Sequence, residues 1–351
     1  MIDMTSLLEQ HGEARVLATG GLVLGLMFGF FAQRSKFCLR AAVIEFWRGK
    51  LGEKLPVWLL AFSTAVVTVQ LLILLGWLNV SNARQLANTG SLSGALMGGL
   101  IFGVGMVLTR GCASRLLVLS ATGNLRALLS GLIFAVVAQA SMGGALSPLR
   151  LSISSWWTVD GGASRDLLAW TGVGHVGGLL FGGVWLVAGV YFAVRNRWSA
   201  GQWITTVLTG LTVALAWWFS FAVASSSFEV VNVQGLTFSS PSIEWLMRVL
   251  VAPAPPIGFD TGLLPGVFLG AFLGAMVGRE WKLEGFKEGF SMPRYIIGAI
   301  LMGFGAILAG GCAVGAGMSG GAIFAITAWM TLAGMWMGAG ITDRLVDKVS
   351  A

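Results

Sequence analysis

Two stretches of sixteen residues decide how this sequence is interpreted: GGLIFGVGMVLTRGCA at residues 98–113 and GAILMGFGAILAGGCA at residues 298–313. They lie 200 residues apart and are identical at seven of their sixteen positions. One of the matches is a cysteine, a residue that occurs only three times in the chain. Glycine richness alone does not explain this agreement. The chain therefore contains an internal repeat, and each copy joins a long apolar segment to a Gly-Cys pair.

The composition of the chain is typical of a membrane protein. Of its 351 residues, 56% are hydrophobic and 11% are charged, whereas soluble domains have roughly 25% charged residues. The uncharged stretches are residues 16–33, 55–83, 85–109, 127–149, 167–194, 198–228, 261–278 and 295–342. Each can cross a hydrocarbon core of about 30 Å as a helix. The last has 48 residues and a glycine-rich centre, so we divide it in two. We predict an all-α, polytopic transmembrane protein with about nine spanning helices in a single domain, residues 1–351.

The two copies of the repeat fall in the third and eighth predicted spans, which run in opposite directions. We take the repeat-related segments as residues 94–126 and 294–326. Inverted repeats of this kind are common in secondary transporters, whose binding site lies near the membrane midplane between the repeats. A second match pairs Gly21, Gly25 and Gly29 with Gly266, Gly270 and Gly274. It joins two spans that we expect to be parallel, and its G-x-x-x-G spacing also occurs wherever membrane helices pack closely.

The distribution of positive charge predicts the orientation. The net charge is +7, and 17 of the 22 Lys and Arg residues fall on one face of the predicted topology. The positive-inside rule then places the amino terminus outside and the carboxyl terminus in the cytoplasm of a prokaryotic inner membrane. A nucleic-acid partner is therefore not needed to explain the charge. Acidic residues precede the first span, so we expect a retained helix and not a signal peptide. Residues 229–260 read as an outward loop with a short helix near residues 243–251.

The three cysteines are the strongest candidates for function. Cys38, Cys112 and Cys312 each follow a predicted span and precede an apolar segment of about ten residues, too short to cross a membrane. We interpret these segments as re-entrant half-helices. Gly111 and Gly311 are expected to let the backbone turn with positive φ and to allow close approach. Each cysteine would then lie at a helix amino terminus, where free N–H groups and the helix dipole favour an anion.

A thiol suits a sulfur-containing anion because it is soft and a weak hydrogen-bond donor. A thiolate would repel the anion, so we expect neutral thiols. The cysteines are too sparse for a metal site or a disulfide framework, and we expect no cofactor. Arg34, Arg110 and Arg115 flank the cysteines and are further candidates for the transport path. Basic residues of cytoplasmic loops also serve topology alone.

These motifs resemble the YeeE/YedE family of sulfur transporters, whose characterised members take up thiosulfate. The family pattern matches here at Arg34, Phe37 and Cys38, at Gly111 and Cys112, and at Gly311 and Cys312. The resemblance implies a compact membrane domain with re-entrant helices and an hourglass-shaped path. It also implies that the substrate passes along the three cysteines through hydrogen bonds to its sulfur. The chain after Cys112 is more basic than in thiosulfate-type members, so a related sulfur or selenium species is an alternative substrate.

Two other classes of function remain open. A membrane-embedded sulfur-transfer enzyme would need a reactive, accessible cysteine and an acceptor thiol. A non-transporting scaffold would not need broken helices, whose freed backbone groups are costly in lipid unless they line a cavity. The chain has no Walker motif. We therefore expect a transporter and not an enzyme, with a small sulfur anion, membrane lipid and a cytoplasmic sulfur-carrier protein as its partners.

Overall fold

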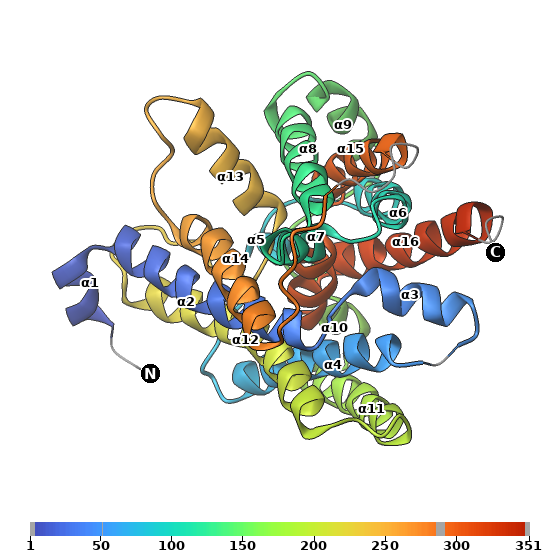
Figure 1. Ribbon diagram of the computed structural model, residues 1–351. Helices are drawn as coiled ribbons and strands as arrows, with labels where there is room; N and C mark the ends of the chain where they lie inside the picture. The colour runs from blue at the N-terminus through green and yellow to red at the C-terminus, as the bar shows by residue number, and fades with distance from the viewer. Residues whose placement is uncertain (1–3, 51, 286–291, 348–351) are drawn as a thin grey trace.

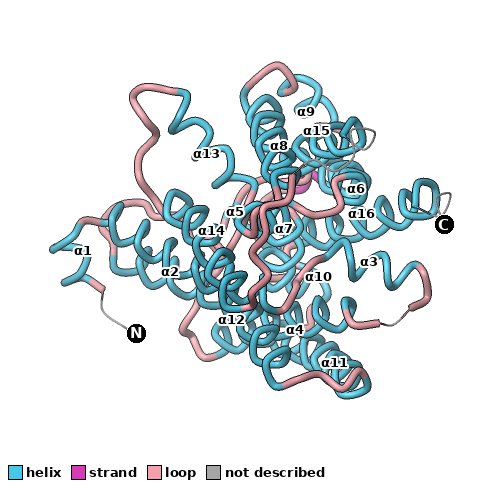
Figure 2. The backbone as a smooth tube through the Cα atoms, viewed as in Figure 1, coloured by secondary structure: helices cyan, strands magenta, loops and turns pink. Residues whose placement is uncertain are grey.

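The computed structural model describes residues 4–50, 52–285 and 292–347, and its regular structure is almost entirely helical (Figure 2). The α-helices are α1 (Thr5–His11), α2 (Glu13–Arg34), α3 (Leu39–Trp47), α4 (Lys54–Leu74), α5 (Arg84–Ala87), α6 (Leu92–Leu108), α7 (Ala113–Ala121), α8 (Leu125–Gly143), α9 (Ser147–Ser154), α10 (Leu167–Thr171), α11 (Gly174–Arg195), α12 (Ala200–Ser226), α13 (Ser239–Leu250), α14 (Phe259–Val277), α15 (Met292–Leu308) and α16 (Ile326–Thr342). The remaining elements are the antiparallel strands β1 (Gly90–Ser91) and β2 (Thr158–Val159), the 3-10 helix η1 (Ala163–Arg165), and the π-helices η3 (Ala313–Gly320) and η4 (Asp343–Asp347). The all-α prediction is confirmed.

Eight segments within the described ranges are long and apolar enough to cross a membrane: Glu13–Trp47, Lys54–Leu74, Leu92–Ala121, Leu125–Gly143, Gly174–Arg195, Ala200–Ser226, Phe259–Val277 and Met292–Gly320. The ninth predicted span corresponds to α16, whose 17 residues lie at the lower limit of spanning helices. Valines and leucines on α11 are exposed to the surroundings: Val176, Leu180, Val184, Val187 and Val194. Such an apolar exterior suits lipid, and the chain is a multi-pass membrane protein.

Helices α6 and α15, which carry the two copies of the repeat, pack against each other in antiparallel fashion. A Cβ atom on Gly98 would lie 2.7 Å from the carbonyl oxygen of Gly305, and one on Gly105 would lie 2.6 Å from that of Gly298. The reverse contacts also exist, because Gly298 faces the Gly105 carbonyl and Gly305 faces the Gly98 carbonyl. The repeated glycines therefore let the two backbones touch, and each contact has a counterpart 200 residues away.

The second glycine match has a different cause. Helices α2 and α14 run parallel: Gly21 and Gly25 face the carbonyl oxygens of Phe259 and Leu263, while Gly262 and Gly266 face those of Ala18 and Leu22. Gly21 therefore corresponds to Gly262 in this pair, and not to Gly266 as the sequence comparison suggests. The match reflects close packing of two parallel helices through small residues. It does not conflict with the antiparallel arrangement of α6 and α15.

The two ends of the described chain lie on opposite sides of the molecule, and the short helix α7 lies near its centre (Figure 1). The segment after α12 differs from the expected outward loop. Val233, Leu236 and Phe238 are 7%, 0% and 1% exposed, so this part of the segment folds into the interior. The predicted short helix is present as α13 (Ser239–Leu250). The burial of residues 233–238 is explained by the three large apolar side chains within these six residues.

Candidate functional site

Three helix ends in the structure share one backbone geometry. In each, the residue two positions before the cysteine has positive φ: Lys36 (55°), Arg110 (60°) and Gly310 (79°). In each, the following N–H group donates back to a carbonyl one turn earlier: Phe37 to Ala32 (3.1 Å), Gly111 to Met106 (3.1 Å) and Gly311 to Ala306 (2.9 Å). This is the Schellman motif, which ends a helix and satisfies its last carbonyls. The chain therefore reverses in the same way before every cysteine.

Each cysteine is then the N-cap residue of a short helix. Cys38 precedes α3, Cys112 precedes α7 and Cys312 precedes η3, all with extended backbone. The predicted position of the cysteines at helix amino termini is confirmed. The first N–H groups of such helices have no partner within the helix. Cys112 and Cys312 are each 1% exposed, whereas Cys38 is half-buried.

The prediction that Gly111 and Gly311 have positive φ is wrong. The positive φ falls one residue earlier, on Arg110 and Gly310, because the Schellman motif places its left-handed residue directly after the helix cap. Close approach does apply at Gly311, where a Cβ atom would lie 3.0 Å from the Ala316 nitrogen. At Gly111 the nearest atom would be the Leu116 Cδ2 at 3.4 Å, which is ordinary contact. Glycine is therefore required by packing at Gly311 more than at Gly111.

The sulfur of Cys312 has backbone donors on two sides. The N–H of Phe238 lies 3.3 Å from it and the N–H of Gly315 lies 3.5 Å from it. The Thr237 hydroxyl is 4.0 Å away. Both N–H groups donate to sulfur lone pairs, so the S–H proton is left for a third partner. Ser319 holds this arrangement in place, since its hydroxyl donates to the Leu236 carbonyl at 2.6 Å.

Cys112 lies in a different environment. Its sulfur is 3.3 Å from the Ser114 hydroxyl, and α7 has no side-chain cap hydrogen bond. A negative charge placed on Cys112 would be repelled by one on Cys38 or Cys312, so the three thiols share one region of the interior. All three are free thiols. No group of three or more His, Cys, Asp or Glu side chains that could hold a metal ion occurs in the described part of the chain.

A chain of three packed aromatic rings runs from the residue before Cys38 to the residue that donates to Cys312. The rings of Phe28 and Phe238 have centroids 5.3 Å apart, and those of Phe28 and Phe37 are 6.4 Å apart. All three side chains are at most 3% exposed. Phe37 precedes Cys38, and Phe238 donates its N–H to Cys312. Sequence reasoning did not single out Thr237 and Phe238, and the apolar residues Val233 and Leu236 before them were the available signal.

The predicted arginines lie beside the junctions without touching a thiol through their side chains. Arg34 ends α2 and packs on Gly278, where a Cβ atom would lie 2.2 Å from its Nη1. Arg110 is exposed. Arg115 donates from Nη1 to Gln33 Oε1 at 3.2 Å, and Gln33 donates to Glu280 at 2.8 Å. These bonds join α7 to the carboxyl ends of α2 and α14.

A cavity of about 530 Å³ opens beside Cys312. Its lining includes Arg84, Arg150 and Arg165, together with Gly310 and Gly315, which flank the cysteine. No acidic residue lines it within the described chain. These arginines are three of the five basic residues on the sparsely charged face, where topology does not require them, and sequence reasoning did not select them.

Arg165 is the most constrained of the three arginines. It is 6% exposed and donates to Thr327 Oγ1 at 2.7 Å and to the Arg84 carbonyl at 3.3 Å. Burial and the neighbouring charge of Arg84 lower the pKa of Arg165 to about 10. The guanidinium therefore remains charged at neutral pH, and the cavity has positive potential.

The known proteins that this chain resembles are all sulfur transport proteins in the comparisons below. Residues 34–341 match the family model described as "Sulphur transport". The chain is 27% identical over 347 residues to a thiosulfate transporter, TsuA, of Escherichia coli, covering 93% of this chain and 94% of that protein. It is 28% identical over 345 residues to a TsuA thiosulfate transporter of Spirochaeta thermophila, covering 92% of this chain and 98% of that protein. The similarity therefore extends over nearly the whole length of each protein.

Proposed function

Because the chain belongs to the sulfur transport family, we propose that it carries a small sulfur-containing anion, most simply thiosulfate, inward across a prokaryotic inner membrane. A related sulfur or selenium anion is the alternative cargo. The observation that carries the proposal is the recurrence of one junction: three cysteines, each capping a short helix, in one region of the interior. We treat residues 1–351 as one transport domain, with residues 94–126 and 294–326 as its repeat-related segments.

The proposed path begins in the cavity that contains Arg84, Arg150 and Arg165. Its positive potential concentrates anions in a site of low dielectric, where such fields act most strongly. The anion next meets Cys312, whose flanking glycines line the cavity. Cys112 follows, because it interacts with both of the other thiols. Half-buried Cys38 lies at the exit, near the basic residues Arg34, Arg110 and Arg115.

Each step is a hydrogen bond from a neutral thiol to the sulfur or oxygen of the anion. A thiol is a weaker hydrogen-bond donor than a hydroxyl, so it binds the anion weakly enough for the anion to dissociate. Weak, successive sites allow an ion both to enter and to leave. The packed rings of Phe28, Phe37 and Phe238 form a dry constriction in the path, which prevents water from leaking through. The anion must push these rings aside to pass. No bond is made or broken in this scheme, so it requires no enzyme chemistry.

We propose an outward amino terminus and an inward carboxyl terminus, supported by the basic loop that contains Cys38 and Lys50. A fluorescent protein fused after Lys50 should be bright, and alkaline phosphatase fused at the same residue should be inactive. An active phosphatase there, together with a dark fluorescent fusion at the carboxyl terminus, would show that the orientation is reversed. In the proposed orientation, a cytoplasmic sulfur-carrier protein receives the anion on the side of the loop that contains Cys38 and Lys50.

Uptake measurements test the function directly. Cells that lack other sulfur importers should accumulate labelled thiosulfate when they express this chain, and unlabelled sulfite, sulfate or selenite should compete according to their fit to the path. Purified protein in liposomes should retain this activity. A stable persulfide on one cysteine after thiosulfate addition would instead indicate a sulfur-transfer enzyme. Inactive liposomes and a tightly co-purifying partner would indicate a scaffold.

A further inference from the structure

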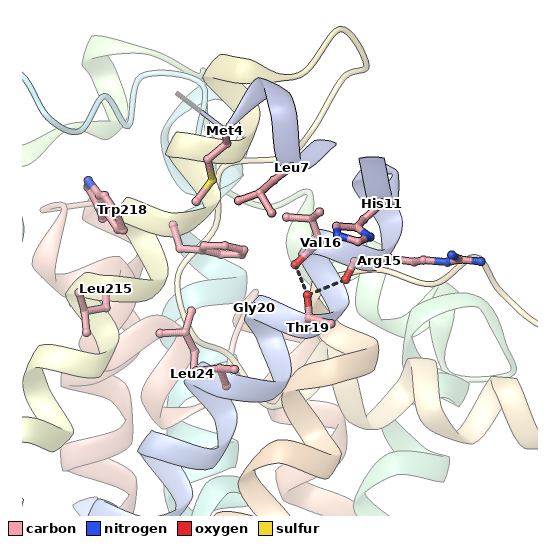
Figure 3. Close-up of a pocket in the computed structure, with 12 residues that line it drawn as sticks. Met4, Leu7, His11, Arg15, Val16, Thr19, Gly20, Leu24, Leu215 and Trp218 are labelled. Atoms are coloured by element: carbon pink, nitrogen blue, oxygen red, sulfur yellow. Dashed lines mark hydrogen bonds between the residues drawn. The ribbon is translucent and has the colours of Figure 1, made fainter. Parts of the chain in front are cut away.

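An apolar cavity of about 630 Å³ lies at the end of the molecule formed by α1, the first turns of α2 and the last turns of α12. Figure 3 shows Met4, Leu7, Leu24, Leu215 and Trp218 converging on this space. Thr19 also lines it, but its hydroxyl bonds to the carbonyls of Arg15 and Val16 on its own helix. Its polar group is thus already satisfied, and the cavity presents an apolar wall. The volume is in the range of specific ligand sites.

The rim of the cavity carries positive charge and hydrogen-bond donors. His11 ends α1, and Arg15 lines both this cavity and its neighbour, with its side chain extending outward past His11 (Figure 3). Within the described residues, neither the Arg15 guanidinium nor the His11 ring has a hydrogen-bond or ion-pair partner. An unpaired guanidinium beside an apolar cavity matches a phosphate, which it can bind through two parallel hydrogen bonds.

A second cavity, of about 440 Å³, shares His11 and Arg15 with the first and contains Glu13 and Glu229. Glu13 accepts a hydrogen bond from the Ser227 hydroxyl through Oε1, whereas its buried Oε2 has no hydrogen-bond partner among the described residues. Two neighbouring carboxyls attract a cation placed between them. A cation that donates several hydrogen bonds, such as a primary ammonium, fits this position best.

The surrounding surface has the character of a membrane interface. Phe228 and Val230, on either side of Glu229, are 96% and 99% exposed. Adjacent apolar side chains that are fully exposed at the end of a spanning helix suit contact with lipid. The apolar cavity, the cationic residues and the two carboxyls follow one another, because His11 and Arg15 line both cavities. This order matches the acyl chain, phosphate and ammonium of an amine-containing phospholipid.

We propose that a glycerophospholipid with a primary-amine headgroup, of the phosphatidylethanolamine type, binds here. One acyl chain occupies the larger cavity, the phosphate bonds to Arg15, and the ammonium lies at Glu229. The site is separate from the cysteines and from the arginine-lined cavity, so it does not depend on the proposed transport of a sulfur anion. The lipid fixes α1 against α2 and α12.

Native mass spectrometry tests the proposal. The full chain is reconstituted in vesicles with equal amounts of phosphatidylethanolamine, phosphatidylcholine and phosphatidylglycerol, extracted in mild detergent, and its retained lipids are counted. Wild-type protein should retain phosphatidylethanolamine preferentially. Arg15→Gln should lower phospholipid retention about tenfold, as expected for loss of a charge-assisted hydrogen bond. Glu229→Gln should remove the preference over phosphatidylcholine and leave phosphatidylcholine retention unchanged.

Three further variants complete the test. Val23→Trp places a bulky ring in the apolar cavity and should reduce retention of all three lipids. Glu53→Gln and Arg195→Gln are control variants that remove one negative and one positive charge. Glu53 precedes the first residue of α4 and Arg195 is the last residue of α11, away from the cavity. Both variants should retain lipids as wild type does. Equal retention of phosphatidylglycerol and phosphatidylethanolamine by the wild type would overturn the proposal. Unchanged retention in both Arg15→Gln and Glu229→Gln would do the same, whether or not thiosulfate is transported.

Discussion

The junctions at Cys112 and Cys312 have the same backbone but different chemistry. Both follow a Schellman motif, and both cysteines cap a short helix. The Cys312 sulfur, however, accepts N–H groups from Phe238 and Gly315, whereas the Cys112 sulfur contacts the Ser114 hydroxyl. A repeated sequence thus determines where a thiol is placed, while the residues packed around it determine which of its donors and acceptors remain available.

The helices that follow the two cysteines also differ. The first is an α-helix and the second is a π-helix. The next long helix begins 13 residues after Cys112, at Leu125, and 14 residues after Cys312, at Ile326. The wider turns of η3 absorb the additional residue, as π-helices commonly do at functional sites. The N–H of Gly315, in the first turn of η3, donates to the Cys312 sulfur.

The largest effect is expected when either thiol is removed. Cys112→Ala and Cys312→Ala each delete a weak donor of about 1 kcal/mol at a point where the anion has few other partners. Thiosulfate uptake should fall tenfold or more, since the loss of the donor adds to the cost of an unsolvated anion, while membrane levels remain normal. Cys38→Ala should have a smaller effect, because Cys38 is half-buried. Wild-type uptake by both buried-site variants would show that these thiols serve packing alone.

Gly315, which lines the cavity beside Cys312, provides a substitution that is specific to this junction, because the equivalent residue at the other junction is Arg115. A Cβ atom at Gly315 would lie 2.5 Å from the Thr237 hydroxyl, so Gly315→Ala displaces the segment that holds Cys312. Uptake should fall about fivefold, in line with a mild overpacking cost. Gly317→Ala is the matched control on the same helix, because its nearest neighbour would be the flexible end of Leu332 at 3.3 Å. Equal activity of the two alanine variants would contradict a specific role for the Thr237 contact.

Serine substitutions should distinguish the two sulfur environments. At Cys312 the N–H donors lie 3.3 and 3.5 Å from sulfur, and the shorter C–O bond of serine moves its oxygen away from them. At Cys112 a serine can keep a hydrogen bond to Ser114. We therefore expect Cys112→Ser to retain roughly two to five times the uptake of Cys312→Ser, with both below wild type. The reverse order in initial uptake rates would argue that cap hydrogen bonds do not orient the Cys312 thiol.

The sequence was sufficient for the features that depend on local patterns. Long apolar stretches predicted the helices, and the three cysteines between a long and a short apolar segment predicted the helix amino termini. The positive-φ positions predicted at Gly111 and Gly311 were misplaced by one residue, because the sequence alone does not show that α6 ends at Leu108 and α15 at Leu308. The register of α2 on α14 was shifted by four residues, since G-x-x-x-G spacing repeats every turn and cannot fix its own alignment.

Features that depend on distant contacts could not be predicted in this way. Phe238 reaches Cys312 from 74 positions away, and nothing in residues 233–238 indicates that partner. Arg84, Arg150 and Arg165 come from three separate short helices, α5, α9 and η1, so only the fold collects them around one cavity. Their scarcity on that face was the available signal. The inverted repeat as a whole remains a prediction, supported by the reciprocal contacts of α6 and α15.

The smallest effect concerns charge, the remaining difference between the two junctions. Arg110 and Arg115 occupy the positions that Gly310 and Gly315 occupy 200 residues later, so only the junction at Cys112 carries arginines within its own repeated segment. If these arginines attract the anion through their field, lysine at either position should keep more than about half of wild-type uptake, because it preserves charge and lacks only the planar fork. Arg110→Gly removes the charge and relieves the positive φ of 60°. The Arg110→Gly protein should fold normally and show a several-fold higher KM for thiosulfate than wild type. High salt should remove this difference, because it screens the charge of Arg110 in the wild type. Near-complete loss in both lysine variants would instead indicate bidentate binding, and the two junctions would then bind the anion by different means.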